Sequence, residues 1–368
     1  MSAIHQFLPT FASRDAIGTH ALHARRILRG MGLESEIYAE GIPRPGRRQA
    51  RPYRTYGRRP TRERTWLLYQ LSTGSAVADF VRARPEPKLV NYHNVTTASL
   101  FAPWEPHVAV ECMEGRRQLR EMAPEVELGI AVSAYNEAEL RDAGYRETTV
   151  APVLVDLDGA DVDPDPEVLG RLERAKRAGG TDWLFVGRVA PHKCQHDVVR
   201  ALAAYRRVYD PKARLHLVGG AGSGAYAGML ERYVAALGLG GAVSLTGSVS
   251  AAALRSYYRS ADVFVCLSEH EGFCVPIMEA MRLSVPVVAF ASTAVPETVA
   301  GAGVLLEAKD PVTAAAAVSR VQEDGVLRAA LVAAGVRRAA DFSLASSTRR
   351  FTEVIAKFLA GQGAEVGR

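Results

Sequence analysis

The most constraining feature of the sequence is a strand, loop, helix and strand pattern in residues 262–299. Residues 263–267 form a continuous apolar run, which predicts a strand buried on both faces. A polar loop then leads to Pro276, which suits the start of a helix because its missing N–H would have no helical partner there. A second apolar run, residues 285–290, predicts the next strand. The pattern indicates an open α/β sheet, in which ligands bind at the carboxyl ends of the strands.

Two carboxylates lie eight residues apart in this unit, Glu271 in the loop and Glu279 in the expected first turn of the helix. The N–H groups at a helix start and the positive end of the helix dipole favour a phosphate. Carboxylates repel a phosphate but suit hydroxyl groups, so a nucleotide sugar would satisfy both kinds of group. Glu279 could instead be an ordinary acid that stabilises its own helix.

The segment EGFCVPIMEA, followed by PVVAF and PETV, resembles the Glu-x7-Glu signature of retaining glycosyltransferases of family 4 (glycosyl transferases group 1), which have the GT-B fold. The resemblance implies that Glu271 contacts sugar hydroxyls and Glu279 the ribose. It also implies that the residues between them line the donor site: Gly272, Phe273, Cys274 and Val275. The family usually has glycine where Cys274 stands, so a different backbone geometry is expected there. Glu297 resembles a further acid of the family, with helix capping as the alternative.

A second motif, Gly187-Arg188 followed by Lys193, comes directly after the expected strand at residues 183–186. Two cations beyond a strand end, beside a glycine that permits close backbone approach, can hold a diphosphate and stabilise its charge as it leaves. The pattern GR-x4-K resembles the phosphate-binding pair of the same family. A surface ion pair is the alternative, but the order of the motifs along the chain favours a donor site.

The glycine-rich stretch at residues 219–224 lacks the G-K-[ST] of a P-loop, so we interpret it as an adaptable loop. The expected strand at residues 243–245 ends close to Gly247 and Val249. The resemblance implies that these two residues lie near the nucleotide base.

The N-terminal part of the chain matches the family only loosely. Gly18 is the one glycine available where the family has a glycine-rich loop, and a turn glycine without a ligand is its alternative. Residues 66–82 predict a helix and residues 88–91 a strand whose end points His93 toward the cleft. In the family a histidine in a comparable place contacts the transferred sugar; a structural histidine is the alternative. Ser133 is expected to cap the helix that follows it.

Residues 150–155 and the acidic, proline-broken stretch after them predict a domain boundary. We expect an α/β protein with the GT-B fold, in which two Rossmann-like, doubly wound domains face a central cleft. Residues 1–155 would form the acceptor-binding domain and residues 156–345 the nucleotide-sugar-binding domain. Residues 346–368 contain a C-terminal helix with an apolar stripe, and the resemblance implies that this helix packs back on the N-terminal domain.

Residues 41–64 hold nine arginines against one acid, Glu63, interleaved with prolines and with Tyr53 and Tyr56. A solvated loop is the first interpretation. The second is peripheral contact of residues 44–64 with an anionic membrane, where each basic residue contributes up to about 1 kcal/mol. No nucleic-acid partner is expected, and the net charge of +5 decides nothing by itself.

The four cysteines show no C-x-x-C pair, which signals neither a zinc site nor a disulfide framework. No apolar run is long enough to cross a bilayer, and the first residues lack the apolar stretch of a signal peptide. We therefore expect a cytoplasmic protein, with a peripheral place at the inner face of the plasma membrane as an option. No cofactor is expected, and no metal, since no Asp-x-Asp cluster stands where a donor-bound cation would be expected.

The resemblance implies a retaining transfer of a hexose of the mannose or glucose type from a nucleotide diphosphate sugar to an acceptor hydroxyl. The acceptor would be a glycan or a lipid-linked molecule of cell-envelope polysaccharide or glycolipid synthesis. Arg188, Lys193, Glu271 and His93 would be the catalytic residues. A nucleotide-sugar epimerase and a non-catalytic nucleotide-sugar binding protein stay open as alternatives; for a phosphorylase, no motif supports a pyridoxal phosphate lysine.

Overall fold

The computed structural model describes residues 2–12, 15–43, 46–57, 64–157 and 162–363. The chain divides into two compact units. Unit 1 comprises Met1–Ser99, His107–Val155 and Ser343–Arg368, and unit 2 comprises Leu100–Pro106 and Asp156–Phe342. The sequence placed residues 100–106 in the first domain, whereas their contacts group them with unit 2.

Unit 1 is built on a parallel sheet of seven strands in the order β3-β2-β1-β4-β5-β6-β7. After β1 the chain winds outward to β2 and β3, and then returns to β4 on the other side of β1, which makes the sheet doubly wound. The central strands are buried along nearly their whole length, as strands covered on both faces must be. The strands are β1 (Ala3–Thr10), β2 (Ile37–Gly41), β3 (Arg51–Pro52), β4 (Thr65–Leu71), β5 (Lys88–Tyr92), β6 (Val126–Ala131) and β7 (Thr148–Val150).

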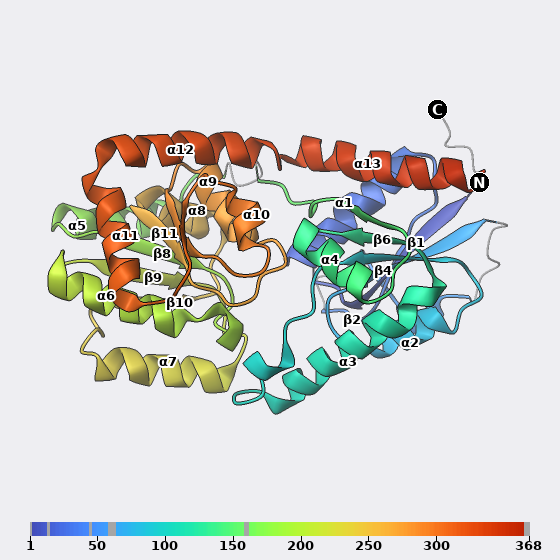
Figure 1. Ribbon diagram of the computed structural model, residues 1–368, viewed down its shortest axis with the longest axis horizontal. Coiled ribbons are helices and arrows are strands. Elements are labelled where there is room, and N and C mark those ends of the chain that lie inside the picture. The colour runs from blue at the N-terminus through green and yellow to red at the C-terminus, as the bar shows by residue number, and fades with distance from the viewer. Residues whose placement is uncertain (1, 13–14, 44–45, 58–63, 158–161, 364–368) are drawn as a thin grey trace. The chain divides into compact units, whose positions relative to one another are not determined.

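Helices cover the sheet of unit 1. They are α1 (Ala16–Gly30), α2 (Ala76–Arg82), α3 (Pro106–Met122), α4 (Ala134–Asp142) and α13 (Leu344–Gly361). The apolar stripe of α13 places Phe351, Ile355 and Leu359 in one buried cluster with Ile4 and Leu28, so the end of the chain completes the core of unit 1 beside α1 (Figure 1). Short 3-10 turns lie at Tyr53–Thr55, Ala98–Leu100 and Ala123–Glu125.

The helix predicted over residues 66–82 is wrong in its first half. Thr65–Leu71 is strand β4, which pairs with β1 on one side and β5 on the other, and only Ala76–Arg82 is helical. All seven residues of β4 are buried. A continuous apolar run fits a doubly covered strand as well as a buried helix, and Gly74 in the connection separates the two elements.

Unit 2 is built on a second parallel sheet, of six strands in the order β10-β9-β8-β11-β12-β13. The predicted strand positions agree with the structure to within a few residues. The strands are β8 (Asp182–Val186), β9 (Arg214–Val218), β10 (Val243–Gly247), β11 (Val263–Cys266), β12 (Val287–Phe290) and β13 (Val304–Leu306).

Both faces of this sheet are also covered by helices (Figure 1). Side chains of α6, α7 and α11 share one buried cluster with Trp183, Val263 and Val265. Phe264 points to the opposite face, where it stacks on Tyr258 of α8 with ring centroids 6.3 Å apart. The helices are α5 (Pro166–Arg177), α6 (Gln195–Val208), α7 (Gly224–Ala236), α8 (Ala251–Ser260), α9 (Val275–Arg282), α10 (Val295–Val299), α11 (Pro311–Glu323) and α12 (Gly325–Ala340), with a 3-10 turn, η5, at Pro191–Lys193. Two doubly wound sheets of this kind agree with the expected fold class.

Candidate active site

The strand order of unit 2 places its switch point between β8 and β11. From β8 the chain winds to β9 and β10 on one side, and it then crosses back to β11 on the other side. The connections that leave two such strands run in opposite directions, which opens a crevice at their carboxyl ends. Both motifs found in the sequence lie here, since Gly187, Arg188 and Lys193 follow β8 and Glu271 follows β11.

Lys193 and Glu271 form an ion pair across this switch point. The Lys193 Nζ atom donates to both carboxylate oxygens of Glu271, each at 2.7 Å. The two side chains are 18% and 9% exposed. Burial by itself lowers the pKa of Lys193, but the Glu271 carboxylate outweighs it, so the net pKa of Lys193 is raised. A fixed ammonium ion therefore stands at the expected position of an anionic ligand.

Arg188 is exposed, and its backbone oxygen accepts a 2.8 Å hydrogen bond from Gln195 Nε2. The adjoining strand ends are unusually close to each other. A Cβ atom on Gly219, at the end of β9, would lie 2.1 Å from the Gly187 oxygen, at the end of β8. Glycine is therefore required at residue 219, and the close approach fixes where Arg188 leaves the sheet.

Gly247 ends β10 with φ of 69°, and its oxygen accepts a hydrogen bond from Gly219 N at 3.1 Å. Val249 follows as a half-buried residue before α8. The structure thus brings Gly187, Gly219 and Gly247 to one sheet edge, at the ends of three neighbouring strands.

The loop that carries Glu271 continues through Gly272 and Phe273 to Cys274, which adopts the left-handed conformation (φ 64°) immediately before α9. Val275 is the first residue of α9, and Cys274 occupies the N-cap position. Among the described residues, no side-chain hydrogen bond caps the helix there. Phe273 is buried against Phe342, with ring centroids 5.0 Å apart. The ring of Phe273 therefore anchors the loop.

Three hydroxyl groups hold the Glu271 loop against the loop that follows β12 and against helix α10. Thr293 Oγ1 accepts from Glu271 N and donates to Glu271 O, both at 2.9 Å. Ser292 Oγ donates to Ser268 O and Thr298 Oγ1 donates to Phe273 O, both at 2.6 Å. Sequence reasoning missed this clamp, although a Ser-Thr pair directly after a buried strand is a detectable signal.

Thr293→Val is expected to weaken donor binding about tenfold while the protein stays folded. Valine keeps the shape of threonine but removes both hydrogen bonds to Glu271, each worth about 1 kcal/mol. Titration calorimetry with a nucleotide sugar measures the effect, and Thr97→Val, at an exposed threonine of unit 1, is the control. Unchanged affinity in Thr293→Val would show that the clamp does not position the loop.

Glu279 is the fifth residue of α9, so it lies in the second turn and not in the first turn that the sequence predicted. Tyr258 Oη donates to Glu279 Oε2 at 2.7 Å. Burial raises the pKa of Glu279, and the hydrogen bond from Tyr258 partly opposes that rise. Tyr258 is a further positioning residue that the sequence did not reveal.

For Ser133 and Glu297 the sequence also allowed a helix-capping role, and the structure shows where each residue lies relative to its helix. Ser133 caps α4, because its side chain accepts from Asn136 N at 3.2 Å, as expected. Glu297 lies in the first turn of α10, and its backbone oxygen accepts from Arg338 Nη2 at 2.7 Å.

The remaining site candidates, Gly18 and His93, belong to unit 1. Gly18 lies inside α1 and is not a turn glycine; a Cβ atom there would lie 1.9 Å from Ala12 O, so packing of the preceding loop requires glycine. His93 follows β5, half-buried, and its Nε2 lies 2.7 Å from Gln70 Oε1. Its ring also packs edge-on against His20, at 4.9 Å between centroids.

His93 is the outer member of a buried polar network that runs across β1, β4 and β5. Gln70 Oε1 also accepts from Asn91 Nδ2 at 3.0 Å, and Gln70 Nε2 donates to Gln6 Oε1 at 2.9 Å. His20 Nδ1 accepts from Leu154 N at 3.0 Å. Burial lowers the pKa of His93 to about 3. The pKa of His20 is also lowered, mainly by burial and secondly by the positive charge that His93 would carry if it were protonated. His93 is thus a neutral imidazole held by Gln70, suited to hydrogen bonding and not to carrying charge.

The lowered pKa values of His20 and His93 should make the protein less stable in acid. Their pKa is lower in the folded than in the unfolded chain, so below about pH 6.5 the unfolded chain binds protons that the folded chain does not. Because of this difference in the pKa of His93, the free energy of unfolding should fall by about 2 kcal/mol between pH 7 and pH 5. Urea unfolding of His93→Gln should show a smaller loss over this range, whereas His107→Gln, at an exposed histidine, should behave as the wild type. Equal losses in all three proteins would contradict the assignment.

The described part of the arginine-rich segment contains exposed Arg47, Arg48, Arg51 and Arg54 and two buried tyrosines, Tyr53 and Tyr56. Tyr56 packs edge-on against Phe7, so the aromatic residues of this segment belong to the core. Residues 44–45 and 58–63, which hold four of the nine arginines, lie outside the described residues. Among the described residues, no helix has the length and apolar character to span a bilayer.

Known proteins share both the second half of the sequence and the fold. Residues 172–338 match the family described as glycosyl transferases group 1. A D-inositol 3-phosphate glycosyltransferase of Kineococcus radiotolerans is 31% identical over 269 residues, which cover 69% of this chain and 61% of the relative. The chain spans about half the length of the curated relatives that it matches.

Solved structures agree along nearly the whole chain. Sucrose-phosphate synthase from Thermosynechococcus elongatus superimposes with a TM-score of 0.77 at 17% identity, over 98% of this chain and 100% of that one. Anabaena Alr3699/HepE in complex with UDP-glucose gives 0.71 at 18% identity, over 96% of this chain and 99% of the other. These likenesses show the fold. The chain has the GT-B architecture, and its residues 172–338 match the glycosyl transferases group 1 family.

Proposed function

We propose that this protein is a retaining glycosyltransferase that moves a hexose from a nucleotide diphosphate sugar to an acceptor hydroxyl. The observation that carries the proposal is the Lys193–Glu271 ion pair across the switch point of unit 2. One partner suits a diphosphate and the other suits sugar hydroxyls, and both stand where open α/β sheets bind ligands.

In the proposed donor complex the ion pair separates into two ligand contacts. Lys193, together with the exposed Arg188, binds the diphosphate, and Glu271 accepts hydrogen bonds from the hexose. Gly187 lets the backbone approach the phosphates, and the start of α9 at Val275 adds its dipole. Glu279, oriented by Tyr258, binds the ribose, and Gly247 and Val249 flank the base.

The reaction breaks the bond between the anomeric carbon and the diphosphate oxygen and forms a bond from that carbon to the acceptor oxygen. The acceptor proton passes to the leaving diphosphate on the same face of the sugar, so the configuration is retained. Arg188 and Lys193 stabilise the negative charge that develops on the leaving group. We assign to His93, neutral and held by Gln70, a hydrogen bond with a hydroxyl of the transferred sugar. Gly18 is assigned to the lining of the same donor site. The proposed chemistry uses no metal ion or cofactor.

For the acceptor, we favour a phosphorylated inositol because several curated relatives are named for one, while another relative is named for the lipid-linked phosphatidylinositol monomannoside. The bound UDP-glucose of a protein with the same fold supports a nucleotide-sugar donor without identifying the base used here. All four cysteines are free thiols, which fits a reducing cytoplasm. Contact of the exposed arginines Arg47 to Arg54 with an anionic membrane is a further part of the proposal.

A turnover assay tests the proposal. Purified protein is incubated with UDP-glucose, GDP-mannose, ADP-glucose or dTDP-glucose, with and without D-inositol 3-phosphate, and nucleoside diphosphate release is measured. We expect one donor to be consumed in an acceptor-dependent reaction, with a product that keeps the anomeric configuration in its NMR spectrum. Conversion of the donor to another nucleotide sugar without acceptor would favour an epimerase, and an inverted product would overturn the retaining assignment.

A further inference from the structure

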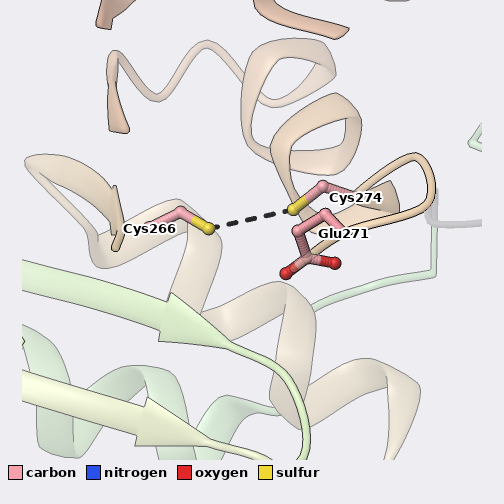
Figure 2. Close-up of side chains that lie close together, drawn as sticks. All are labelled: Cys266, Glu271 and Cys274. Atoms are coloured by element: carbon pink, nitrogen blue, oxygen red, sulfur yellow. Dashed lines mark hydrogen bonds between the residues drawn. The ribbon is translucent and has the colours of Figure 1, made fainter. Parts of the chain in front are cut away.

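Two thiols and a carboxylate come together beside the proposed donor site. Cys266, the last residue of β11, has its Sγ 3.9 Å from Cys274 Sγ, and the Glu271 side chain lies beside the two sulfurs (Figure 2). One potential ligand atom from each of the three residues lies within 4.8 Å of the other two, and all three residues are buried. The sequence spacing gave no metal signal because the cysteines are eight residues apart and the loop between them folds back.

The distance between the two sulfurs fits a small thiophilic cation. Zinc binds cysteine sulfur at about 2.3 Å in tetrahedral geometry, which places two bound sulfurs about 3.8 Å apart. The observed separation of 3.9 Å is close to that edge of the tetrahedron. Two thiolates and one carboxylate would leave a fourth position open, as in zinc sites with three protein ligands.

The backbone of Cys274 gives a second, independent reason to assign its thiol a role. Its φ of 64° lies in the left-handed region, where a side chain is disfavoured and glycine is not. Glycine at this position would therefore relieve strain, yet the chain carries a thiol there. Strained residues of this kind cluster at functional sites.

We propose that Cys266, Cys274 and Glu271 bind a thiophilic divalent cation of the zinc class, and that the bound ion excludes the sugar donor. Binding releases the two thiol protons to solvent. It also draws the Glu271 carboxylate away from Lys193 and from the sugar hydroxyls. The ion is thus an inhibitor and not a cofactor, and this second step rests on the proposed donor site.

Binding of Cd²⁺, a spectroscopic substitute for Zn²⁺, tests the site without any donor. The protein is kept reduced with a phosphine, so that a disulfide cannot be mistaken for metal binding, and the ultraviolet thiolate-to-cadmium absorption is titrated. We expect one ion per chain, and loss of this binding in Cys266→Ala. Cys112→Ala, at a buried cysteine of unit 1, should bind as the wild type. No absorption in the wild type, or full binding in Cys266→Ala, would overturn the proposal.

Lys193→Met separates the metal site from the donor site. The ammonium group repels a cation at Glu271, so its removal should tighten Cd²⁺ binding and weaken donor binding. Lys193→Leu, which adds no thioether sulfur that could itself bind Cd²⁺, should tighten Cd²⁺ binding equally. Zn²⁺ should also raise the apparent dissociation constant of the wild-type protein for its nucleotide sugar, and a chelator should reverse the effect. If the metal ion binds but does not compete with the nucleotide sugar, only the inhibitory role is refuted. Weaker Cd²⁺ binding in Lys193→Met than in the wild type would place the ion elsewhere.

Discussion

Replacing Lys193 with methionine is expected to lower the rate of glycosyl transfer by about 100- to 1,000-fold, as removal of one preorganised charge-stabilising group typically does. The ammonium group is the partly buried cation of the site and would contact the leaving diphosphate. Glu271→Gln should reduce transfer to a similar extent, because a neutral amide holds the sugar hydroxyls less firmly. Initial rates at the same donor and acceptor concentrations as for the wild type measure both losses.

The two side chains also stabilise each other, so each single variant should unfold more easily. Removal of one partner leaves the other charge largely buried, at a cost of about 3 kcal/mol. The double variant Lys193→Met with Glu271→Gln removes both charges and should recover most of this stability without recovering activity. Urea unfolding followed by circular dichroism makes the comparison. Recovered activity in the double variant, or full activity in either single variant, would contradict the assignment.

Gly219→Ala is expected to lower the free energy of unfolding by about 3 kcal/mol and to abolish donor binding. The added Cβ would lie 2.1 Å from the Gly187 oxygen, and the φ of 148° disfavours any side chain. Because the added Cβ would meet backbone atoms of Gly187, β8 and β9 would have to separate, and the segment that carries Arg188 would move with them. Thermal unfolding and titration calorimetry measure the two effects.

Gly224→Ala is the matched control, since a Cβ atom there meets no other atom within 4 Å and the residue begins α7 in the same unit. Its stability should equal or slightly exceed that of the wild type. A stable Gly219→Ala protein that binds donor normally would show that the close contact between the strand ends is dispensable.

The elements of unit 2 were predictable because each apolar run there is short and ends in a polar loop with its own signal. β8, β10, β11 and β12 were predicted to within a few residues. In unit 1 the same reasoning failed at β4, where an apolar strand and the following amphipathic helix are joined by only four residues. Hydrophobic content alone could not separate the two.

Partnerships between distant residues were beyond the sequence. Lys193 and Glu271 were each singled out, but nothing in their spacing of 78 residues showed that they bond to each other. His20 and Gln70, which hold His93, come from a helix and a strand whose adjacency follows only from the strand order of unit 1. The thiols of Cys266 and Cys274 meet because a left-handed residue turns the loop back, and that conformation has no signal when the residue is not glycine.

The central claim is that unit 2 binds a nucleotide diphosphate sugar through Lys193 and Glu271, and thermal stabilisation by UDP-glucose, GDP-mannose, ADP-glucose and dTDP-glucose tests it most directly. The measurement is made with a chelator present, so that metal binding cannot interfere. A donor at a hundred times its dissociation constant adds about 2.7 kcal/mol to the free energy of unfolding. We expect one of the four to raise the melting temperature of the wild type and of Cys112→Ala, and none to raise that of Lys193→Met. The same rise in Lys193→Met, or no response of the wild type to any of the four, would contradict the account.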